Sequence, residues 1–168
     1  MNVNFSMKMI GAVGLMALAA ACSSTKSTGP DVAATDNANT GVSSIVAGSQ
    51  EDLEQNVGHR VFFGLDQYSL TPQAQATLQR QADFLKQHSN VRVVVSGNCD
   101  ERGTREYNLA LGARRAEAAR AYLVSMGIDS SRVTAVSYGK ERPIDPRSTE
   151  EAWSLNRNAT TTISAVGA

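Results

Sequence analysis

Val91-Arg-Val-Val-Val-Ser96 is the strongest strand signal in the chain, because its β-branched residues suit a pleated, half-buried surface. A polar turn over residues 97–106 follows, and then a helix is predicted to about Met126, closed by Gly127. A loop between a buried strand and a helix presents its side chains to solvent on a rigid scaffold. This strand–turn–helix unit therefore predicts part of the fold and also a place for functional residues.

Further strands and helices are predicted on both sides of this unit. Upstream, Arg60-Val-Phe-Phe63 indicates a short strand, and Thr71-Pro72 indicates the start of a helix that runs to about His88. Downstream, the pattern predicts a strand over 133–137, a short helix over 150–156 and a last strand over 159–163. Strands that alternate with helices predict an α/β sandwich, with helices packed on one sheet.

The N-terminal residues have the pattern of a bacterial lipoprotein signal. After a short segment whose only charge is Lys8, twelve small or apolar residues lead to Cys22, whereas a membrane-spanning helix needs about 20. A cysteine directly after the small residues 19–21 resembles the lipobox, in which that cysteine is acylated and becomes the mature N-terminus. Ser23, in place of an acidic residue, favours the outer membrane. We expect residues 1–21 to be removed and Cys22 to anchor the protein, facing the periplasm of a Gram-negative bacterium. The alternative is a plain secretory signal with an incidental Cys22.

The composition predicts one folded domain behind a flexible tether. Residues 22–50 hold almost no large apolar side chain and are expected to be disordered, whereas residues 51–168 are enough for one core without disulfides. The chain has 16 basic and 16 acidic residues, so removal of Lys8 with the signal leaves 15 against 16, a net charge near minus one. Such a balance lacks the basic excess of nucleic-acid-binding proteins. With Cys22 acylated, Cys99 has no partner for a disulfide.

The periodicity of the helix after the turn separates two adjacent arginines. At about 100° per residue, Arg114 falls opposite the apolar stripe and Arg115 falls on its flank. We therefore expect Arg114 to be solvated and Arg115 to be half-buried, with a carboxylate from the protein or a ligand as its partner. Asp100 is the nearest candidate in sequence, although the turn's charges alone are equally compatible with a self-paired surface loop. The stripe consists of Leu109, Gly112, Ala116, Ala119, Leu123 and Met126.

A family resemblance is carried by Val95-Ser-Gly-Asn-Cys-Asp-Glu-Arg-Gly-Thr-Arg-Glu-Tyr-Asn-Leu-Ala-Leu-Gly-Ala-Arg-Arg-Ala116, which closely resembles the signature of OmpA-like peptidoglycan-binding domains. Two further segments narrow the resemblance to the lipoproteins of Tol-Pal systems, namely Val136-Ser-Tyr-Gly-Lys-Glu-Arg-Pro143 and Phe63-Gly-Leu-Asp-Gln-Tyr68. The resemblance covers residues 57–163 and agrees with the lipobox and the tether. It implies an OmpA-like domain, with helices on one face of a mixed four-stranded sheet.

The ligand that the resemblance implies is the peptide stem of peptidoglycan, bound through the side chain of meso-diaminopimelate. That side chain ends in an ammonium and a carboxylate on one carbon. The resemblance assigns the ammonium to Asp100 and the carboxylate to Arg115, whose planar guanidinium can grip a carboxylate with two hydrogen bonds.

The resemblance implies roles at five further positions. Leu65 and Asp66 line the ligand pocket, Leu111 and Ala118 form its apolar wall, and Asn108 caps or braces the loop. Asp66 is a second possible acceptor for the ammonium, and its alternative is a turn residue that bonds its own backbone. Trp153 is expected to close the edge of the core.

The resemblance also implies partners. TolB is the expected periplasmic partner, TolA is a further candidate, and the expected role is in envelope constriction at cell division. The alternative is a wall-tethering OmpA-like lipoprotein without a Tol partner.

A cell-wall hydrolase using Asp100 and Glu101 is disfavoured because adjacent turn residues usually diverge, and Cys99 has no nearby histidine as base. His59 and His88 are isolated, so we expect no metal and no cofactor. A flagellar stator would need a transmembrane helix, and none is predicted after the signal.

Overall fold

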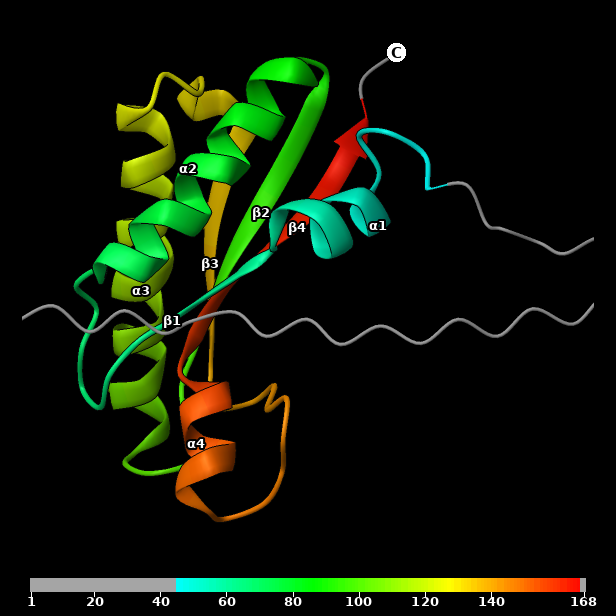
Figure 1. The fold of residues 1–168 in the computed structure, drawn as a ribbon. Helices are drawn as coiled ribbons and strands as arrows, with labels where there is room; N and C mark the ends of the chain where they lie inside the picture. The colour runs from blue at the N-terminus through cyan, green and yellow to red at the C-terminus, as the bar shows by residue number, and fades with distance from the viewer. Residues whose placement is uncertain (1–44, 167–168) are drawn as a thin grey trace, which may run out of the picture. The chain divides into compact units, whose positions relative to one another are not determined.

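The computed structural model describes residues 45–166. The predicted signal peptide, Cys22 and most of the predicted tether lie outside the described residues. In chain order the elements are α1 (Gln50–Asp52), the π-helical turn η1 (Leu53–Val57), β1 (Arg60–Phe62), α2 (Pro72–Gln87), β2 (Val91–Asn98), α3 (Arg105–Ser125), the 3-10 turn η2 (Ser130–Arg132), β3 (Val133–Gly139), α4 (Glu150–Asn156) and β4 (Asn158–Val166) (Figure 1).

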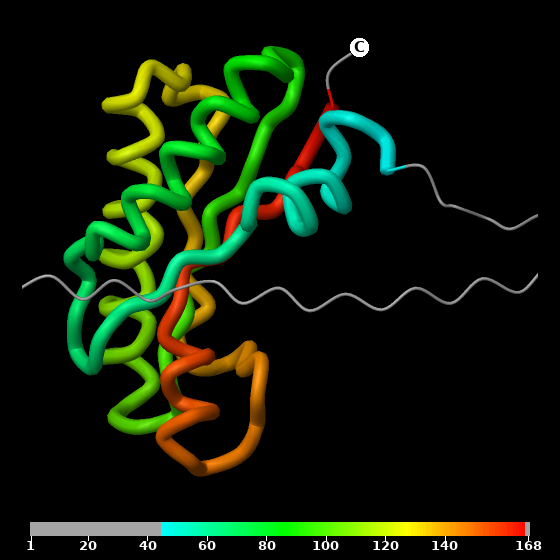
Figure 2. The backbone as a smooth tube through the Cα atoms, in the orientation of Figure 1, coloured from blue at the N-terminus to red at the C-terminus, as the bar shows by residue number. Residues whose placement is uncertain are grey.

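The four strands form one mixed sheet in the order β1-β4-β2-β3. The last strand, β4, lies inside the sheet and pairs antiparallel with both β1 and β2, whereas β2 and β3 run parallel. The two long helices α2 and α3 lie on the same face of the sheet (Figures 1 and 2). The predicted α/β sandwich, with helices on one face of a mixed four-stranded sheet, is therefore confirmed.

The core lies between this face of the sheet and the two long helices. Alternate residues of the strands point into it. In β2, for example, Val91, Val93 and Val95 are buried, whereas Arg92 is exposed. They pack with helix residues in one cluster, which includes Leu78, Leu85, Ala116, Ala119 and Leu123. The apolar stripe predicted for α3 is thus largely the core face of that helix.

Threonine caps begin the three helices α2, α3 and α4. The hydroxyl of Thr71, Thr104 or Thr149 accepts a hydrogen bond from the backbone N–H three residues later in each helix. A side-chain oxygen at this position satisfies one of the backbone donors that a helix start leaves without an internal partner. The helix start predicted at Thr71-Pro72 is confirmed.

Two glycines let α3 lie directly on the end of β2. A Cβ on Gly97 would collide with the backbone carbonyl of Gly112, and a Cβ on Gly112 would collide with the hydroxyl of Ser137. That hydroxyl donates a 2.7 Å hydrogen bond to the carbonyl of Leu109 in α3. This close approach fixes the start of α3 beside the end of β2, where the polar turn lies.

Helix α1 lies at the predicted junction of tether and folded domain, near residue 51. The hydroxyl of Ser49 caps α1, and the side chain of Gln50 accepts a 2.8 Å hydrogen bond from the N–H of Ile163 in β4. Leu53 is fully buried in the core. Residues 50–57 contain only two large apolar residues, Leu53 and Val57. Two such residues form too weak a pattern to predict a helix.

Candidate binding site

A hollow of about 540 Å³ lies where β2 passes into α3. Four parts of the chain line it: the loop after β1, the turn after β2, the first half of α3, and the junction of α4 with β4. The lining residues are Leu65, Asp66, Cys99, Asp100, Arg102, Gly103, Thr104, Tyr107, Asn108, Leu111, Arg115 and Arg157. The fold thus brings together all of the residues predicted to bind the ligand except Ala118.

Asp100 is buried at the wall of this hollow, with 4% of its surface exposed. Its Oδ1 accepts hydrogen bonds from the backbone N–H and Nε of Arg102, at 3.1 and 3.2 Å. Its Oδ2 accepts from Nη2 of Arg102 at 2.7 Å and from Nη1 of Arg157 at 3.3 Å. Burial alone would raise the pKa of Asp100, but the hydrogen bonds from the two arginines outweigh it and hold the pKa below its usual value. Asp100 is therefore an ionised carboxylate.

The two arginines that bind Asp100 differ in their surroundings. Arg157 is buried, and its Nη2 lies 2.8 Å from the Glu150 carboxylate. Arg102 is partly exposed, and its guanidinium stacks 4.1 Å from the centre of the Trp153 ring. Trp153 donates from Nε1 to Glu101 at 3.0 Å and so braces the turn. This differs from the prediction that Trp153 closes the edge of the core.

Arg115 is fully buried, which corrects the prediction of a half-buried side chain. Its Nε donates to the carbonyl of Gln67 at 2.8 Å, and its Nη2 donates to the carbonyl of Gly64 at 3.0 Å. Its Nη1 donates to the carbonyl of Asn98 at 2.8 Å and to the sulfur of Cys99 at 3.4 Å. Of the two predicted sources of a carboxylate partner, the protein and a ligand, the described residues supply none, because the loop after β1 covers the guanidinium with carbonyl groups.

The hydrogen bonds of Arg115 limit how it can contact a ligand. A guanidinium has five N–H groups, and the bonds within residues 45–166 use four of them. One N–H on Nη2 remains for a ligand. Two parallel bonds to a ligand carboxylate, as expected from the sequence, would require Arg115 to give up part of this network. Arg114 is exposed, as predicted, with its guanidinium 5.6 Å from the ring of Tyr68.

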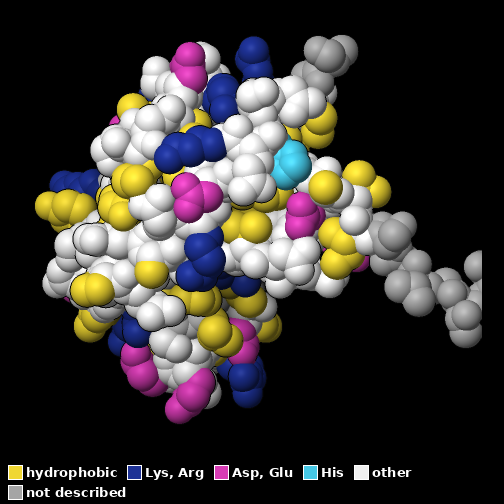
Figure 3. Space-filling model, turned by 45° about the horizontal axis from the view of Figure 1, so that its top comes forward, with side chains coloured by type: hydrophobic (Ala, Val, Ile, Leu, Met, Phe, Trp, Pro, Cys, Tyr) yellow, Lys and Arg dark blue, Asp and Glu magenta, His cyan; other side chains and the backbone are white. Residues whose placement is uncertain are grey.

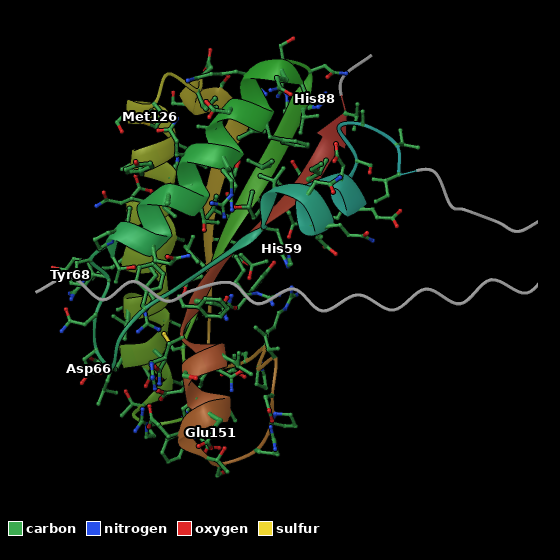
Figure 4. All side chains as sticks on the ribbon, viewed as in Figure 1. His59, Asp66, Tyr68, His88, Met126 and Glu151 are labelled. Atoms are coloured by element: carbon green, nitrogen blue, oxygen red, sulfur yellow. The ribbon has the colours of Figure 1, made fainter. Side chains whose placement is uncertain are left out.

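Asp66 supplies a second carboxylate, on the more open side of the hollow. It lies in the loop between β1 and α2, and its φ of 54° is in the left-handed region (Figure 4). Its Oδ1 accepts a 3.1 Å hydrogen bond from the hydroxyl of Tyr107, and this bond raises the pKa of Tyr107. The alternative of an aspartate that bonds its own backbone is not seen. Leu65 beside it is 53% exposed.

The remaining predicted residues have three different placements. Nδ2 of Asn108 donates to the carbonyls of Arg102 and Thr104, at 2.8 and 3.1 Å, and so braces the turn. Leu111 is a buried apolar residue that lines the hollow. Ala118 is half-buried outside the hollow, because seven residues place it about 10 Å beyond Leu111 along the helix axis.

The chemistry expected of a hydrolase or a metal site is not assembled in the described part of the chain. Asp100 points into the hollow, whereas Glu101 is exposed and accepts from Trp153, so the two carboxylates diverge. His59 and His88 lie on separate segments (Figure 4), and residues 45–166 hold no group of three or more metal-ligating side chains. Within the same range no helix combines the length and apolar character needed to cross a bilayer.

The surface charges are mixed on the face that Figure 3 shows. Basic and acidic side chains alternate over this face without a broad area of one sign. This pattern agrees with the formal net charge of zero for the whole chain.

Comparison with known proteins places these features in a family. A family model described as the OmpA family matches residues 62–157. The peptidoglycan-associated lipoprotein of Mesorhizobium japonicum is 49% identical over 159 residues, which cover 95% of this chain and 92% of that protein. The peptidoglycan-associated lipoprotein of Haemophilus influenzae is 39% identical over 158 residues, which cover 94% of this chain and 97% of that protein.

Solved structures agree with this comparison. The crystal structure of the peptidoglycan-associated lipoprotein from Burkholderia pseudomallei gives a TM-score of 0.61 at 45% identity, over 62% of this chain and 89% of that chain. The C-terminal domain of Helicobacter pylori MotB gives a TM-score of 0.60 at 20% identity, over 63% of this chain and 84% of that chain. At this lower identity the MotB likeness shows the fold alone.

Proposed function

The chain belongs to the OmpA family and, within it, to the peptidoglycan-associated lipoproteins, and on this premise we propose that it is an outer-membrane lipoprotein that binds peptidoglycan non-covalently. Its relatives are named for association with peptidoglycan, and it acts by binding and is not an enzyme. Acylated Cys22 holds it in the outer membrane, and the folded part faces the periplasm.

The ligand within peptidoglycan is the side chain of meso-diaminopimelate, bound in the hollow at the end of β2. The observation that carries this part of the proposal is the presence of carboxylates and guanidiniums in one hollow. The ligand carbon bears both an ammonium and a carboxylate, so it requires groups of both charges. Asp66 and Asp100 are the acceptors for the ammonium, and Asp66 is open because the Tyr107 hydroxyl is its one hydrogen-bond partner among residues 45–166. Arg115 attracts the carboxylate through its charge and its remaining N–H, and Leu111 contacts the apolar part of the side chain.

The test compares two soluble stem tripeptides, one that ends in meso-diaminopimelate and one that ends in lysine. Lysine lacks the carboxylate, so the arginine charge is left without a partner, at a cost of about 2 to 5 kcal/mol or about 30-fold or more in affinity. Calorimetry on the detergent-solubilised lipoprotein measures both. Asp66→Asn should weaken binding of the diaminopimelate peptide, whereas Asp83→Asn, in an exposed position on α2, should not. Equal affinity for the two peptides contradicts the proposal.

We extend the proposal to a Tol-Pal system, with TolB as partner, TolA as a further candidate partner, and a role in envelope constriction at cell division. The support is the resemblance of residues 63–68 and 136–143 to the lipoproteins of such systems. A binding assay with purified TolB distinguishes this role from that of a wall tether without a Tol partner.

A further inference from the structure

Arg102 occupies the position on Asp100 that the proposed ligand needs. Its Nε and Nη2 donate to the two carboxylate oxygens of Asp100 at 3.2 and 2.7 Å, which is a two-pronged ion pair. Arg157 takes a further position on Oδ2 at 3.3 Å. An ammonium that enters the hollow therefore meets a carboxylate whose charge is already neutralised by the chain itself.

The two guanidiniums are not equally easy to displace. The Arg157 side chain is 9% exposed and is tied to Glu150 and to the carbonyl of Phe63, whereas the Arg102 side chain is 34% exposed. Both line the hollow, but Arg102 is the more exposed of the two. If one of the two yields to a ligand, it is Arg102.

Arg102 also has contacts that do not involve Asp100. Its guanidinium stacks on Trp153 at 4.1 Å, and its Nη1 lies 3.7 Å from Oε2 of Glu150, which is an exposed carboxylate. A cation over an aromatic face is attracted to it even in solvent. Arg102 can therefore leave Asp100 without becoming an isolated charge, because Glu150 and Trp153 remain beside it.

We propose that Arg102 is an exchangeable counter-ion of Asp100, which an ammonium group of the ligand displaces when it enters the hollow. The inference rests on the proposed binding of diaminopimelate and adds a residue to that site. During the exchange Arg157 keeps Asp100 paired, so no buried carboxylate is left alone at any stage. The affinity for the ligand is then set by the difference between two ion pairs, and a ligand without an ammonium gains nothing from Asp100.

The first experiment removes the competitor. Arg102→Gln keeps a polar, though shorter, side chain and abolishes its charge. The variant's affinity for the meso-diaminopimelate tripeptide should therefore exceed that of the wild type about five- to tenfold, as expected for loss of a competing, partly exposed ion pair. Arg147→Gln is the matched control. Arg147 pairs with Asp145 two residues before it through the same backbone N–H and Nε donors, yet it does not line the hollow. Its affinity should equal that of the wild type.

The second experiment has its main readout in the wild-type protein, because Trp153 is the single tryptophan of the chain. As Arg102 leaves Asp100, its guanidinium should shift over the ring of Trp153, and this shift should change the fluorescence of the indole as the tripeptide is added to the wild-type lipoprotein. The change should saturate at the affinity that calorimetry gives. In Arg102→Gln the peptide should still bind while this fluorescence change is lost.

The outcomes separate this inference from the proposed function. If the wild-type protein does not bind the tripeptide in calorimetry, the proposed function fails and the inference fails with it. If the wild type binds but Arg102→Gln binds equally or more weakly, Arg102 is not a competitor and the inference alone is wrong. Binding to the wild type with no change in Trp153 fluorescence overturns it as well.

Discussion

Arg115 joins three segments that are distant in sequence. Its donors hold the loop after β1 through Gly64 and Gln67, and they hold the end of β2 through Asn98. These three acceptors are backbone carbonyls, which in a buried place need a donor. Arg115 is therefore a structural residue of the hollow as well as a charge in its wall, and any variant of it changes both properties.

The substitution Arg115→Lys should destabilise the fold. A lysine ammonium cannot reproduce the planar arrangement of donors, so at least one buried carbonyl loses its partner, at a cost of about 1 to 3 kcal/mol. Urea denaturation measures this free energy of unfolding. Arg114→Lys is the neighbouring control, and because this residue is exposed its effect should stay within about 0.5 kcal/mol. An Arg115→Lys protein as stable as the wild type would show that the network is dispensable.

Helix α3 owes its position to the small residues at its contact with β2. Gly97 and Gly112 let the two backbones touch, and the capped start of α3 then stands beside Asp100. A side chain at this contact would move the helix away from the sheet and widen the hollow. The glycine pair is thus part of the geometry of the site, although neither residue lines it.

Gly97→Ala should be among the most damaging single substitutions in the domain. Its Cβ meets the backbone of Gly112, which cannot move aside without shifting α3, so we expect a loss of about 3 kcal/mol or more. Gly127→Ala is the comparison: it has open space around the added Cβ, and its φ of 93° adds only backbone strain of about 1 to 2 kcal/mol. Thermal unfolding of both variants ranks the two effects, and an equal loss would argue against the close contact.

The sequence predicts the longer elements well because their signals are local. The helix after Thr71 is found with its cap, and the helix over 150–156 is found with its bounds, since such signals lie within a few residues. Strand ends are missed because they depend on partners: β2 reaches Asn98 by pairing with Gly139, which is far along the chain. Helix α1 depends on contact with Ile163 and has almost no local signal.

In the candidate site, too, contacts between residues close in sequence could be predicted, whereas contacts between distant residues could not. The fold brings Asp100 and Arg115 to one hollow, as the resemblance and the helix periodicity suggested. The pair of Asp100 with Arg102 spans two residues and was available from the sequence as a self-paired turn. The pair with Arg157 spans 57 residues and left no local signal. Burial of Arg115 was underestimated because helix periodicity does not include the loop that covers it.

The two proposals together make the protein a membrane anchor joined to a wall-binding domain. The anchor is predicted at Cys22, before the described residues, and the site lies at the end of β2. The two functions depend on separate parts of the chain, so each should survive the loss of the other.

Cys22→Ser should abolish acylation and release the protein from the outer membrane, because the proposed lipid anchor is attached at this cysteine. Fractionation after enzymatic digestion of the peptidoglycan measures this, since wall binding alone could otherwise retain the variant in the pellet. The diaminopimelate tripeptide should bind the variant with unchanged affinity. A variant that still sediments with digested membranes would show that another segment holds it.

The pairing of β1 with β4 has a mechanical consequence. The described chain enters beside Ile163, through Gln50, and β1 then runs antiparallel to β4 toward Arg157 and the hollow. A membrane that pulls on the N-terminal side and a wall that holds the hollow would therefore load these strands along their length. Under such shear the hydrogen bonds between β1 and β4 bear the force together instead of opening one at a time, which suits a domain that has to hold an envelope under tension.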